Sequence, residues 1–341
     1  MPDEVEHAEH ADGVTETLDV PQSDVEPMAT VLRILRLGRL GPDRFTGTSL
    51  PQLSGRIYGG QVLAQSVLAA HATLPADGGR QLHSVHGYFL RPGKVDLPIS
   101  FAVERLHDGR SFSTRRTHAL QQGKPILSLI SSYQEDQPGR DHSSTAPAAP
   151  DPETLRSAIT LFGEIDHPVA KFMSSIAAFD IRHVDQDVYL RPAGSAERTQ
   201  MLWMRARSPL PAGLTQLQHR ALLAYACDQV LLEPVLRRHG LSWRTRGLSV
   251  ASLDHSMWWH RDVAVDDWLL FVQDSPSAQG GRGLGTAQVF DRAGTHVATI
   301  AQEGMIRVPD DDDGARSADA TSDGAVPETP ADGEWRRPSL R

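Results

Sequence analysis

The stretch from residue 249 to residue 260 alternates apolar and polar side chains with a period close to two, which predicts a β-strand. One face carries the apolar positions Ala251, Leu253, Met257 and Trp259. The other face carries Ser252, Asp254 and Ser256. Trp258 falls among the polar positions, so we expect burial on both sides of the strand. Because buried hydroxyl, carboxylate and imidazole groups need hydrogen-bond partners, other segments should supply them.

Apolar spacing in the N-terminal part predicts two helices followed by a run of antiparallel strands. The first helix spans residues 28–40, and the second begins at Tyr58-Gly59-Gly60-Gln61 and continues to about Ala70. Glycines at a helix start allow close packing and leave N–H groups available. The strands predicted after it are residues 82–90, 97–106, 111–121 and 125–134.

The C-terminal part repeats this order. Two short strands, at residues 179–184 and 201–205, precede a helix from Gln218 to about Leu232, which is apolar nearly all round and should be buried. Pro234 should kink or end this helix. The strands predicted after it are residues 249–260, 268–273, 286–290 and 297–302.

Short matches between the two parts support an internal repeat. HGYF at 86–89 aligns with HSMW at 255–258, DGRS at 108–111 with GGRG at 280–283, and Gly123 with Gly294. We predict an α+β fold of two tandem helix-plus-antiparallel-sheet units that form one continuous sheet, not a doubly wound parallel sheet. On the same alignment, Ser252 stands where the first half has His83.

Charge and composition divide the 341 residues further. Residues 1–30 carry nine acidic groups and no Lys or Arg, and residues 308–341 carry nine acidic groups and four Arg. Against a total charge of −9, this leaves residues 31–307 with an excess of five positive charges, too few to indicate a nucleic-acid partner. The predicted divisions are a disordered acidic tail at 1–27, a unit at 28–134, a linker at 135–155, a unit carrying the candidate site at 156–307 and a second disordered tail at 308–341.

Other features bear on the cellular setting. Cys227 is the only cysteine, so no internal disulfide can form, and we expect a small core residue in a reducing compartment. No apolar run approaches the roughly 18 residues that a membrane span needs. The acidic N-terminus is unlike a targeting peptide, and Ser339-Leu340-Arg341 does not match a Ser-Lys-Leu address. We therefore expect a cytoplasmic protein without a membrane partner.

Asp228 is the strongest candidate for chemistry. Helical spacing places this carboxylate on an apolar stripe, where it must be hydrogen-bonded or neutralised. It could equally cap a kink near Pro234 or pair with an arginine. Gln302 ends an apolar strand and could be an edge amide, and Ser252 alone would be an ordinary strand serine. Together the three groups could hold a water and direct it at a carbonyl group.

Several other motifs carry weaker signals. His83, His86 and His255 invite a histidine-based scheme, but no Gly-x-Ser-x-Gly elbow is present, so we favour packing on strand faces for them. No His-Glu-x-x-His motif or cysteine pair indicates a metal. The run GGRG at 280–283 could form a backbone nest for a phosphate or an ordinary turn.

Motifs in both halves follow one another in a recognisable order. In the first half they are RIYGGQ (56–61), HSVHGYFLRPG (83–93), DGRSF (108–112) and TRR (114–116). In the second half they are YACD (225–228), SLDHSMW (252–258), SPSA (275–278), GGRG (280–283) and QEG (302–304). Over about residues 30–307, the linker excepted, the chain resembles a type II acyl-CoA thioesterase. This resemblance implies a double hotdog fold, which agrees with the repeat.

The resemblance also implies a charge-relay set of Asp, Ser or Thr, and Gln, which falls on Asp228, Ser252 and Gln302. The implied reaction is hydrolysis of a fatty acyl-CoA to a free acid and CoA. Asp228 would accept a proton from a water that the other two residues hold, without an acyl-enzyme, a cofactor or a metal. A homo-oligomer is implied on the same grounds.

Positions for substrate binding are less sharply indicated. The candidates are Gly59, Gly60, His83, Gly281 and Arg282. The N–H donors that polarise the thioester oxygen should lie near Gly59-Gly60 or on the second helix.

Two alternatives stay open. A hotdog-fold enoyl-CoA hydratase would use an Asp and a His together, but Asp254 and His255 are too close in sequence to face one site from a strand. A non-catalytic acyl-CoA binding module would need no Asp on the buried helix.

Overall fold

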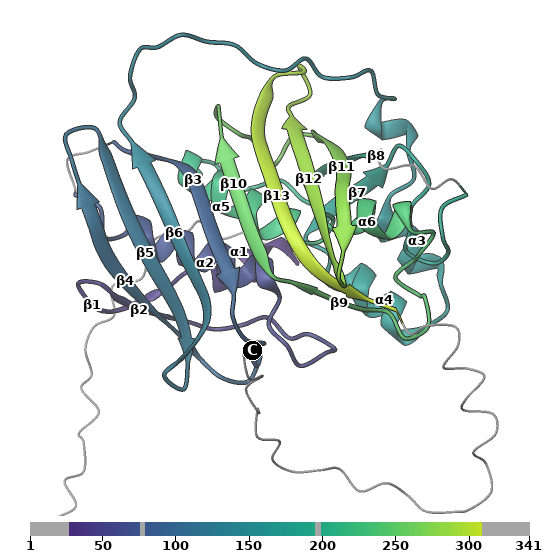
Figure 1. Ribbon diagram of the computed structural model, residues 1–341, viewed down its shortest axis with the longest axis horizontal. Coiled ribbons are helices and arrows are strands. Elements are labelled where there is room, and N and C mark those ends of the chain that lie inside the picture. Colours follow the sequence, from purple (N-terminus) through teal and green to yellow (C-terminus); the bar gives the residue numbers. More distant parts are fainter. Residues whose placement is uncertain (1–26, 76–78, 195–198, 309–341) are drawn as a thin grey trace, which may run out of the picture. The chain divides into compact units, whose positions relative to one another are not determined.

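The computed structural model describes residues 27–75, 79–194 and 199–308. The two predicted acidic tails therefore lie outside the described residues, apart from residues 27 and 308 at their inner ends. The remaining chain forms one unit in which helices cover one face of a large antiparallel sheet (Figure 1). Among the helices of these three ranges, none is long and apolar enough to cross a membrane.

Both halves contain two strands before a central helix and four strands after it, and the second half adds a 3-10 helix, a second helix before its first two strands, a short helix after its central helix and one further short strand. In the first half these are α1 (Met28–Ile34), β1 (Gly38–Gly41), β2 (Arg44–Gly47), α2 (Gly59–His71), β3 (Gln81–Phe89), β4 (Ile99–Asp108), β5 (Phe112–Gln121) and β6 (Lys124–Gln134). Residues 135–151 follow without regular structure. In the second half they are the 3-10 helix η1 (Pro152–Thr154), α3 (Ala158–Glu164), α4 (Pro168–Ile176), β7 (Phe179–His183), β8 (Thr199–Ala206), α5 (Gln216–Cys227), α6 (Glu233–Arg238), β9 (Ser249–Ser252), β10 (Asp254–Trp259), β11 (Leu269–Gln279), β12 (Arg282–Phe290) and β13 (His296–Arg307).

The order of the strands shows that the halves are related by a pseudo-twofold axis. The strands run β1-β2-β4-β5-β6-β3-β10-β13-β12-β11-β8-β7, and β9 pairs with β13. Counted inward from each edge, β4 corresponds to β11, β5 to β12, β6 to β13 and β3 to β10. The halves join where β3 pairs with β10, with His86 opposite Ser256. The predicted repeat, the α+β class and the continuous sheet are confirmed.

Helices α2 and α5 form the centre of the packing. Eleven of the 13 residues of α2 are buried, and α5 is buried from Gln218 to Cys227 except at His219. A single apolar cluster includes side chains from both helices and from strands of both halves. Burial of apolar surface on this scale is the main stabilising term of a fold, so the halves share one core.

The observed helices differ from the predicted ones at their ends. The helix predicted over residues 28–40 ends at Ile34, because residues 38–41 form strand β1 at the sheet edge. Helix α5 begins at Gln216, where Thr215 and Gln218 form a capping box, and it ends at Cys227. Pro234 does not kink this helix, since it lies in the first turn of the separate helix α6, where a proline costs no hydrogen bond.

The strand predicted over residues 249–260 is also not continuous. It divides at Leu253 into β9 and β10. Trp258 is 37% exposed, so the expected burial on both sides is wrong. The outer face of the sheet is open to solvent at this strand, as antiparallel sheets allow.

Candidate active site

The site lies where the C-terminal end of α5 meets the N-terminal end of α2. A side chain at Gly60 would place its Cβ 2.2 Å from the carbonyl oxygen of Tyr225, so this approach requires glycine. The Tyr58 hydroxyl donates to the same carbonyl oxygen over 2.6 Å. Tyr58 occupies the N-cap of α2, and its side chain does not cap the helix. The first N–H groups of α2 therefore point at the end of α5 without a side-chain cap.

Asp228 occupies the C-cap of α5, with its carboxylate directed at the start of α2. Its Oδ2 accepts a hydrogen bond from the backbone N–H of Gly60 over 2.9 Å. Its Oδ1 accepts from the Ser252 hydroxyl over 3.1 Å and from Gln302 Nε2 over 2.9 Å. In the part of the chain that the structure describes, Asp228 therefore neither pairs with an arginine nor caps a kink near Pro234, the two alternatives considered from the sequence. The N-terminal end of the α2 dipole also stabilises a negative charge at this position.

Ser252 reaches this cluster because of a β-bulge. Ser252 lies opposite Gly304 on β13, whereas Met257 lies opposite Ile300. Five steps along one strand thus match four along the other, and the extra residue reverses the alternation of side chains. Asp254 supports this bulge, because its Oδ1 accepts from the backbone N–H of Glu303 over 2.8 Å. The prediction that Ser252 and Met257 occupy opposite faces is therefore wrong.

Gln302 connects the members of the cluster. Its Nε2 donates to Asp228 Oδ1 and, over 2.7 Å, to Ser252 Oγ. Its Oε1 lies 2.7 Å from Nδ1 of His255. Gln302 is fully buried, while Asp228 and Ser252 are partly exposed. The amide therefore forms the floor of the site, and the carboxylate and the hydroxyl can be reached by a substrate.

Burial and the charge of Asp228 keep the neighbouring groups protonated. Burial raises the pKa of the Tyr58 hydroxyl well above its usual value, and the nearby Asp228 raises it further. The pKa of the Cys227 thiol is likewise raised well above its usual value, by burial and then by Asp228. Neither group can supply an anionic nucleophile near neutral pH. The sequence-based reading of Cys227 as a small core residue agrees with its complete burial.

The glycine candidates fall at this end of the sheet. Gly59 begins α2 beside Asp228, and a Cβ at that position would lie 2.8 Å from Asp228 Oδ2. The Gly280-Gly281 turn, with φ values of 60° and 73°, joins β11 to β12. Gly283 lies opposite Gly304, which lies opposite Ser252, so the turn lies at the same end of the sheet as Ser252 but two strands away from it.

Two other candidates have structural partners of their own. Arg282 is exposed, and its Nε donates to Glu303 over 3.1 Å. His83 is not brought to the cluster. Strand β3 meets the site at Tyr88, opposite Asp254, and His83 lies five residues back, roughly 17 Å along the strand. Its Nε2 is instead within 2.9 Å of Ser132 Oγ.

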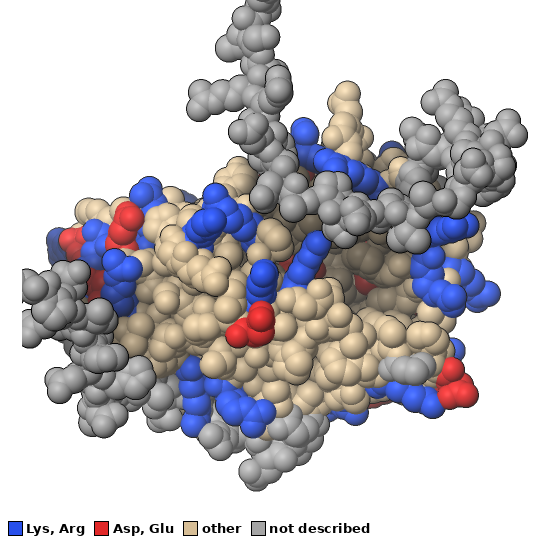
Figure 2. Space-filling view, turned by 90° about the horizontal axis from the view of Figure 1, so that it is seen from below, with Lys and Arg blue, Asp and Glu red and all other residues tan. Residues whose placement is uncertain are grey.

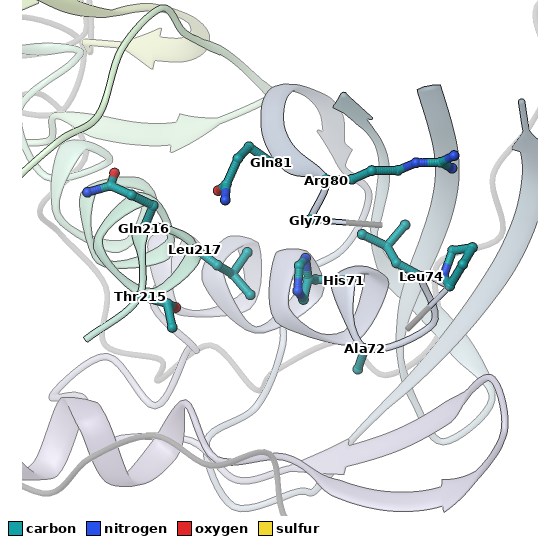
Figure 3. A pocket seen from close by; sticks show the side chains of 10 residues that line it. His71, Ala72, Leu74, Gly79, Arg80, Gln81, Thr215, Gln216 and Leu217 are labelled. Atoms are coloured by element: carbon teal, nitrogen blue, oxygen red, sulfur yellow. The ribbon is translucent and has the colours of Figure 1, made fainter. Parts of the chain in front are cut away.

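The opposite end of the helix pair holds the pseudo-twofold counterpart of the site. A pocket of about 410 Å³ lies there, between the end of α2 and the start of α5. Figure 3 shows His71, the last residue of α2, beside Leu217 in the first turn of α5. His71 lies one residue before the C-cap of α2, the position that Asp228 occupies in α5. Burial lowers the pKa of His71 to about 4, so the ring is neutral at pH 7.

The counterpart differs from the site in one further respect. At the start of α5, the Thr215 hydroxyl accepts from the N–H of Gln218, whose side chain accepts from the N–H of Thr215. This helix start is thus capped by its own side chains, whereas that of α2 donates to Asp228. Only one end of the helix pair therefore combines a carboxylate with a helix N-terminus.

Sequence reasoning missed the contribution of His255 and Tyr58. His255 was assigned to strand-face packing, and it is indeed fully buried, but it also contacts Gln302. Tyr58 lies in the RIYGGQ motif, which was read for its glycines. Tyr58 could have been identified from its position directly before Gly59 and Gly60. A side chain at that position packs against the segment that approaches the start of the helix, here the end of α5. Within the described ranges, no group of three or more His, Cys, Asp or Glu side chains is placed to hold a metal ion.

The fold and the site together define a double hotdog protein with a water-accessible carboxylate between its two central helices. The family described as the acyl-CoA thioesterase N-terminal domain matches residues 49–134, and that described as the acyl-CoA thioesterase C-terminal domain matches residues 144–306. The chain belongs to the type II acyl-CoA thioesterases and is a thioester hydrolase.

Individual relatives agree along most of their length. The chain is 34% identical to acyl-coenzyme A thioesterase 8 of Homo sapiens over 290 residues, which cover 82% of this chain and 89% of the human protein. It is 31% identical to acyl-CoA thioesterase 2 of Haemophilus influenzae, covering 81% and 96% of the two chains. The crystal structure of acyl-CoA thioesterase II TesB2 from Mycobacterium marinum superposes with a TM-score of 0.68 at 37% identity, covering 82% and 99%.

Proposed function

We propose that Asp228 is the general base of a fatty acyl-CoA hydrolase, and that Ser252 and Gln302 hold the attacking water with it. The observation that carries this proposal is that the hydrogen bonds to the Asp228 carboxylate leave one of its acceptor positions open. A carboxylate offers about four acceptor positions. Oδ1 of Asp228 accepts two hydrogen bonds and Oδ2 accepts one, which leaves a position on Oδ2 for a proton from water.

Ser252 provides the second contact to this water. A hydroxyl has one donor and two acceptor positions. Ser252 Oγ donates to Asp228 Oδ1 and accepts from Gln302 Nε2, so one acceptor position is open. A water whose two hydrogens point at Asp228 Oδ2 and Ser252 Oγ has its own lone pair directed away from both, toward the thioester carbon. As the carbon is attacked, Asp228 takes the proton and the CoA thiolate leaves.

The developing negative charge on the thioester oxygen needs donors. The N–H of Gly60 already bonds Asp228, so it does not serve this purpose. The N–H of Gly59 occupies the first helical position of α2, where no intrahelical acceptor exists. We assign the oxyanion contact to this N–H, because it combines a free donor with the positive end of the helix dipole.

The surroundings of the site suit the anionic CoA portion. Seen from below Figure 1, the surface has Lys and Arg side chains around a hollow (Figure 2). Exposed cations occur in the segments that border the site, namely Arg56, Arg91, Lys94, Arg282 and Arg307. The Gly280-Gly281 turn is the proposed contact for a CoA phosphate, through backbone N–H groups. His83 has no part in this proposal.

The proposed organisation keeps the division predicted from sequence. Residues 28–134 and 156–307 are the two hotdog units, joined by the linker at 135–155, and the active site belongs to the second unit with the start of α2 supplied by the first. We further propose a role in fatty acid metabolism and a homo-oligomeric state, which the family resemblance implies, and a cytoplasmic location, which fits the single cysteine.

Release of free thiol from a panel of acyl-CoAs tests the function. The wild type should release thiol, and Asp228→Asn should lower kcat by at least about a hundredfold, because the amide cannot accept the proton. Asp228→Asn keeps the size of the side chain and the acceptor oxygen for Ser252 and Gln302 but loses the bond from the Gly60 N–H. The variant should therefore fold, with a melting temperature about 2–4 °C lower. Thiol release by Asp228→Asn at the wild-type rate would show that another group activates the water.

A further inference from the structure

The orientation of the Gln302 amide decides whether the proposed site is assembled. With Nε2 toward Asp228 and Ser252, the amide donates to both. With the amide turned over, its oxygen would face the carboxylate at the same distance, and two acceptors would repel each other. Asp228 therefore disfavours the turned amide from one side of Gln302. A hydrogen-bond donor to Oε1 would hold the amide in the same orientation from its other side.

That donor is His255. Its Nδ1 lies 2.7 Å from Gln302 Oε1. Since an amide oxygen can only accept, Nδ1 must carry the hydrogen of this bond. The other ring nitrogen, Nε2, lies 3.4 Å from Sγ of Cys227, whose thiol can donate to it. The histidine is thus held as the Nδ1–H tautomer, with a partner at each nitrogen.

We infer that His255 is a positioning residue for hydrolysis, which acts by fixing the Gln302 amide so that it donates to Asp228 and Ser252. The inference rests on the function proposed above. His255 lies on β10 directly after the bulge that brings Ser252 to the site. Both residues are therefore placed by the same irregularity of the strand.

His255 does not itself contact substrate or water. The side chains of His255, Gln302 and Cys227 are each 0% exposed, so the whole chain of hydrogen bonds lies below the floor of the site. Burial lowers the pKa of His255, and the nearby Asp228 only partly opposes this effect. The ring is neutral at neutral pH and donates through one nitrogen only. A single donor at Nδ1 fixes the orientation of the Gln302 amide.

Two substitutions at this position separate positioning from packing. His255→Leu keeps a buried side chain but removes the donor. His255→Asn places its Nδ2 where Nδ1 was, because both atoms are bonded to Cγ. We expect His255→Leu to lower kcat about tenfold to a hundredfold, the range for outer partners that orient a functional ligand. His255→Asn should keep kcat within about threefold of the wild type, and KM should be similar in all three proteins.

A double-mutant cycle with Gln302 completes the test. If His255 acts through the amide, adding His255→Leu to Gln302→Ala should lower kcat by less than about twofold. His86→Leu is the matched control, because His86 likewise contacts a polar side chain of a neighbouring strand, that of Ser256, but does so on the exposed outer face, and kcat of this variant should not change. Equal losses in His255→Leu and His255→Asn, or additive losses in the cycle, would overturn the inference. Loss of activity in Asp228→Asn together with either of those results would leave the proposed function intact.

Discussion

The two oxygens of Asp228 have different environments, and this difference organises the site. Oδ1 is shared by Ser252 and Gln302, and Oδ2 is fixed by the Gly60 N–H on one side and open on the other. A general base needs both an acceptor position and a fixed orientation. Asp228 has these because it caps one helix and faces the start of another, so neither helix alone would provide the site.

Substitution of Ser252 tests the hydroxyl at this scale. Ser252→Ala removes a donor to a charged oxygen, a contact worth about 1.5–3 kcal/mol, which corresponds to about a tenfold to 150-fold lower kcat if it acts in the transition state. Ser252→Thr keeps the hydroxyl and should retain most of the activity. Steady-state hydrolysis of one acyl-CoA by both variants measures the effect. Equal activity of Ser252→Ala and the wild type would remove the hydroxyl from the mechanism.

At the scale of elements, the antiparallel helix pair α2 and α5 offers two similar ends, of which one carries the cluster. The two ends differ in the residue types that meet there. One end has Asp228, which accepts from the Gly60 N–H at the start of α2, and the other has His71 and a helix start capped by its own Thr215 and Gln218. The Nδ1 atom of His71 is buried without a hydrogen-bond partner. This end therefore favours a neutral ring.

The neutral ring of His71 makes stability depend on pH. Its pKa is about 4 in the folded chain against about 6.5 when unfolded, so the folded state binds fewer protons between these values. The free energy of unfolding should be greatest above pH 6.5 and fall as the pH drops toward 4, by at most about 1.4 kcal/mol per pH unit from this group. Denaturant unfolding at several pH values should show a smaller decline for His71→Leu than for the wild type. The same decline in both proteins would contradict the assignment.

Helices and strands were predicted well where the local sequence pattern determines them, and poorly where tertiary contacts determine their ends or irregularities. Alternation and turn residues located β3 to β6 in the first half and the strands at 179–183, 199–206 and 249–307 in the second, and apolar composition located α2 and α5. The short strands β1 and β2 were missed. The bulge at Leu253 could not be predicted, because it depends on the register between β9, β10 and β13. The end of α5 at Cys227 was missed because the apolar pattern continues through the following turn. The capping box at Thr215 was visible in the sequence and would have placed the start of α5.

At the scale of the whole molecule, the site depends on both halves of the described chain. The second half supplies Asp228, Ser252 and Gln302, and the first supplies the start of α2. The candidate residues were predicted from motif resemblance, but their convergence requires the pairing of β3 with β10 and the packing of α2 on α5. These contacts join residues more than 150 positions apart, which no local pattern reveals.

The most direct test of this account is hydrolysis of an acyl-CoA in H2¹⁸O under single-turnover conditions, with enzyme in excess and the reaction quenched for mass spectrometry. Direct attack by a water bound to Asp228 and Ser252 places one ¹⁸O in the free acid and leaves the protein mass unchanged throughout the turnover. An acyl adduct on the quenched protein, or ¹⁸O in the Asp228 carboxylate, would show that Asp228 attacks the thioester itself and would contradict the account.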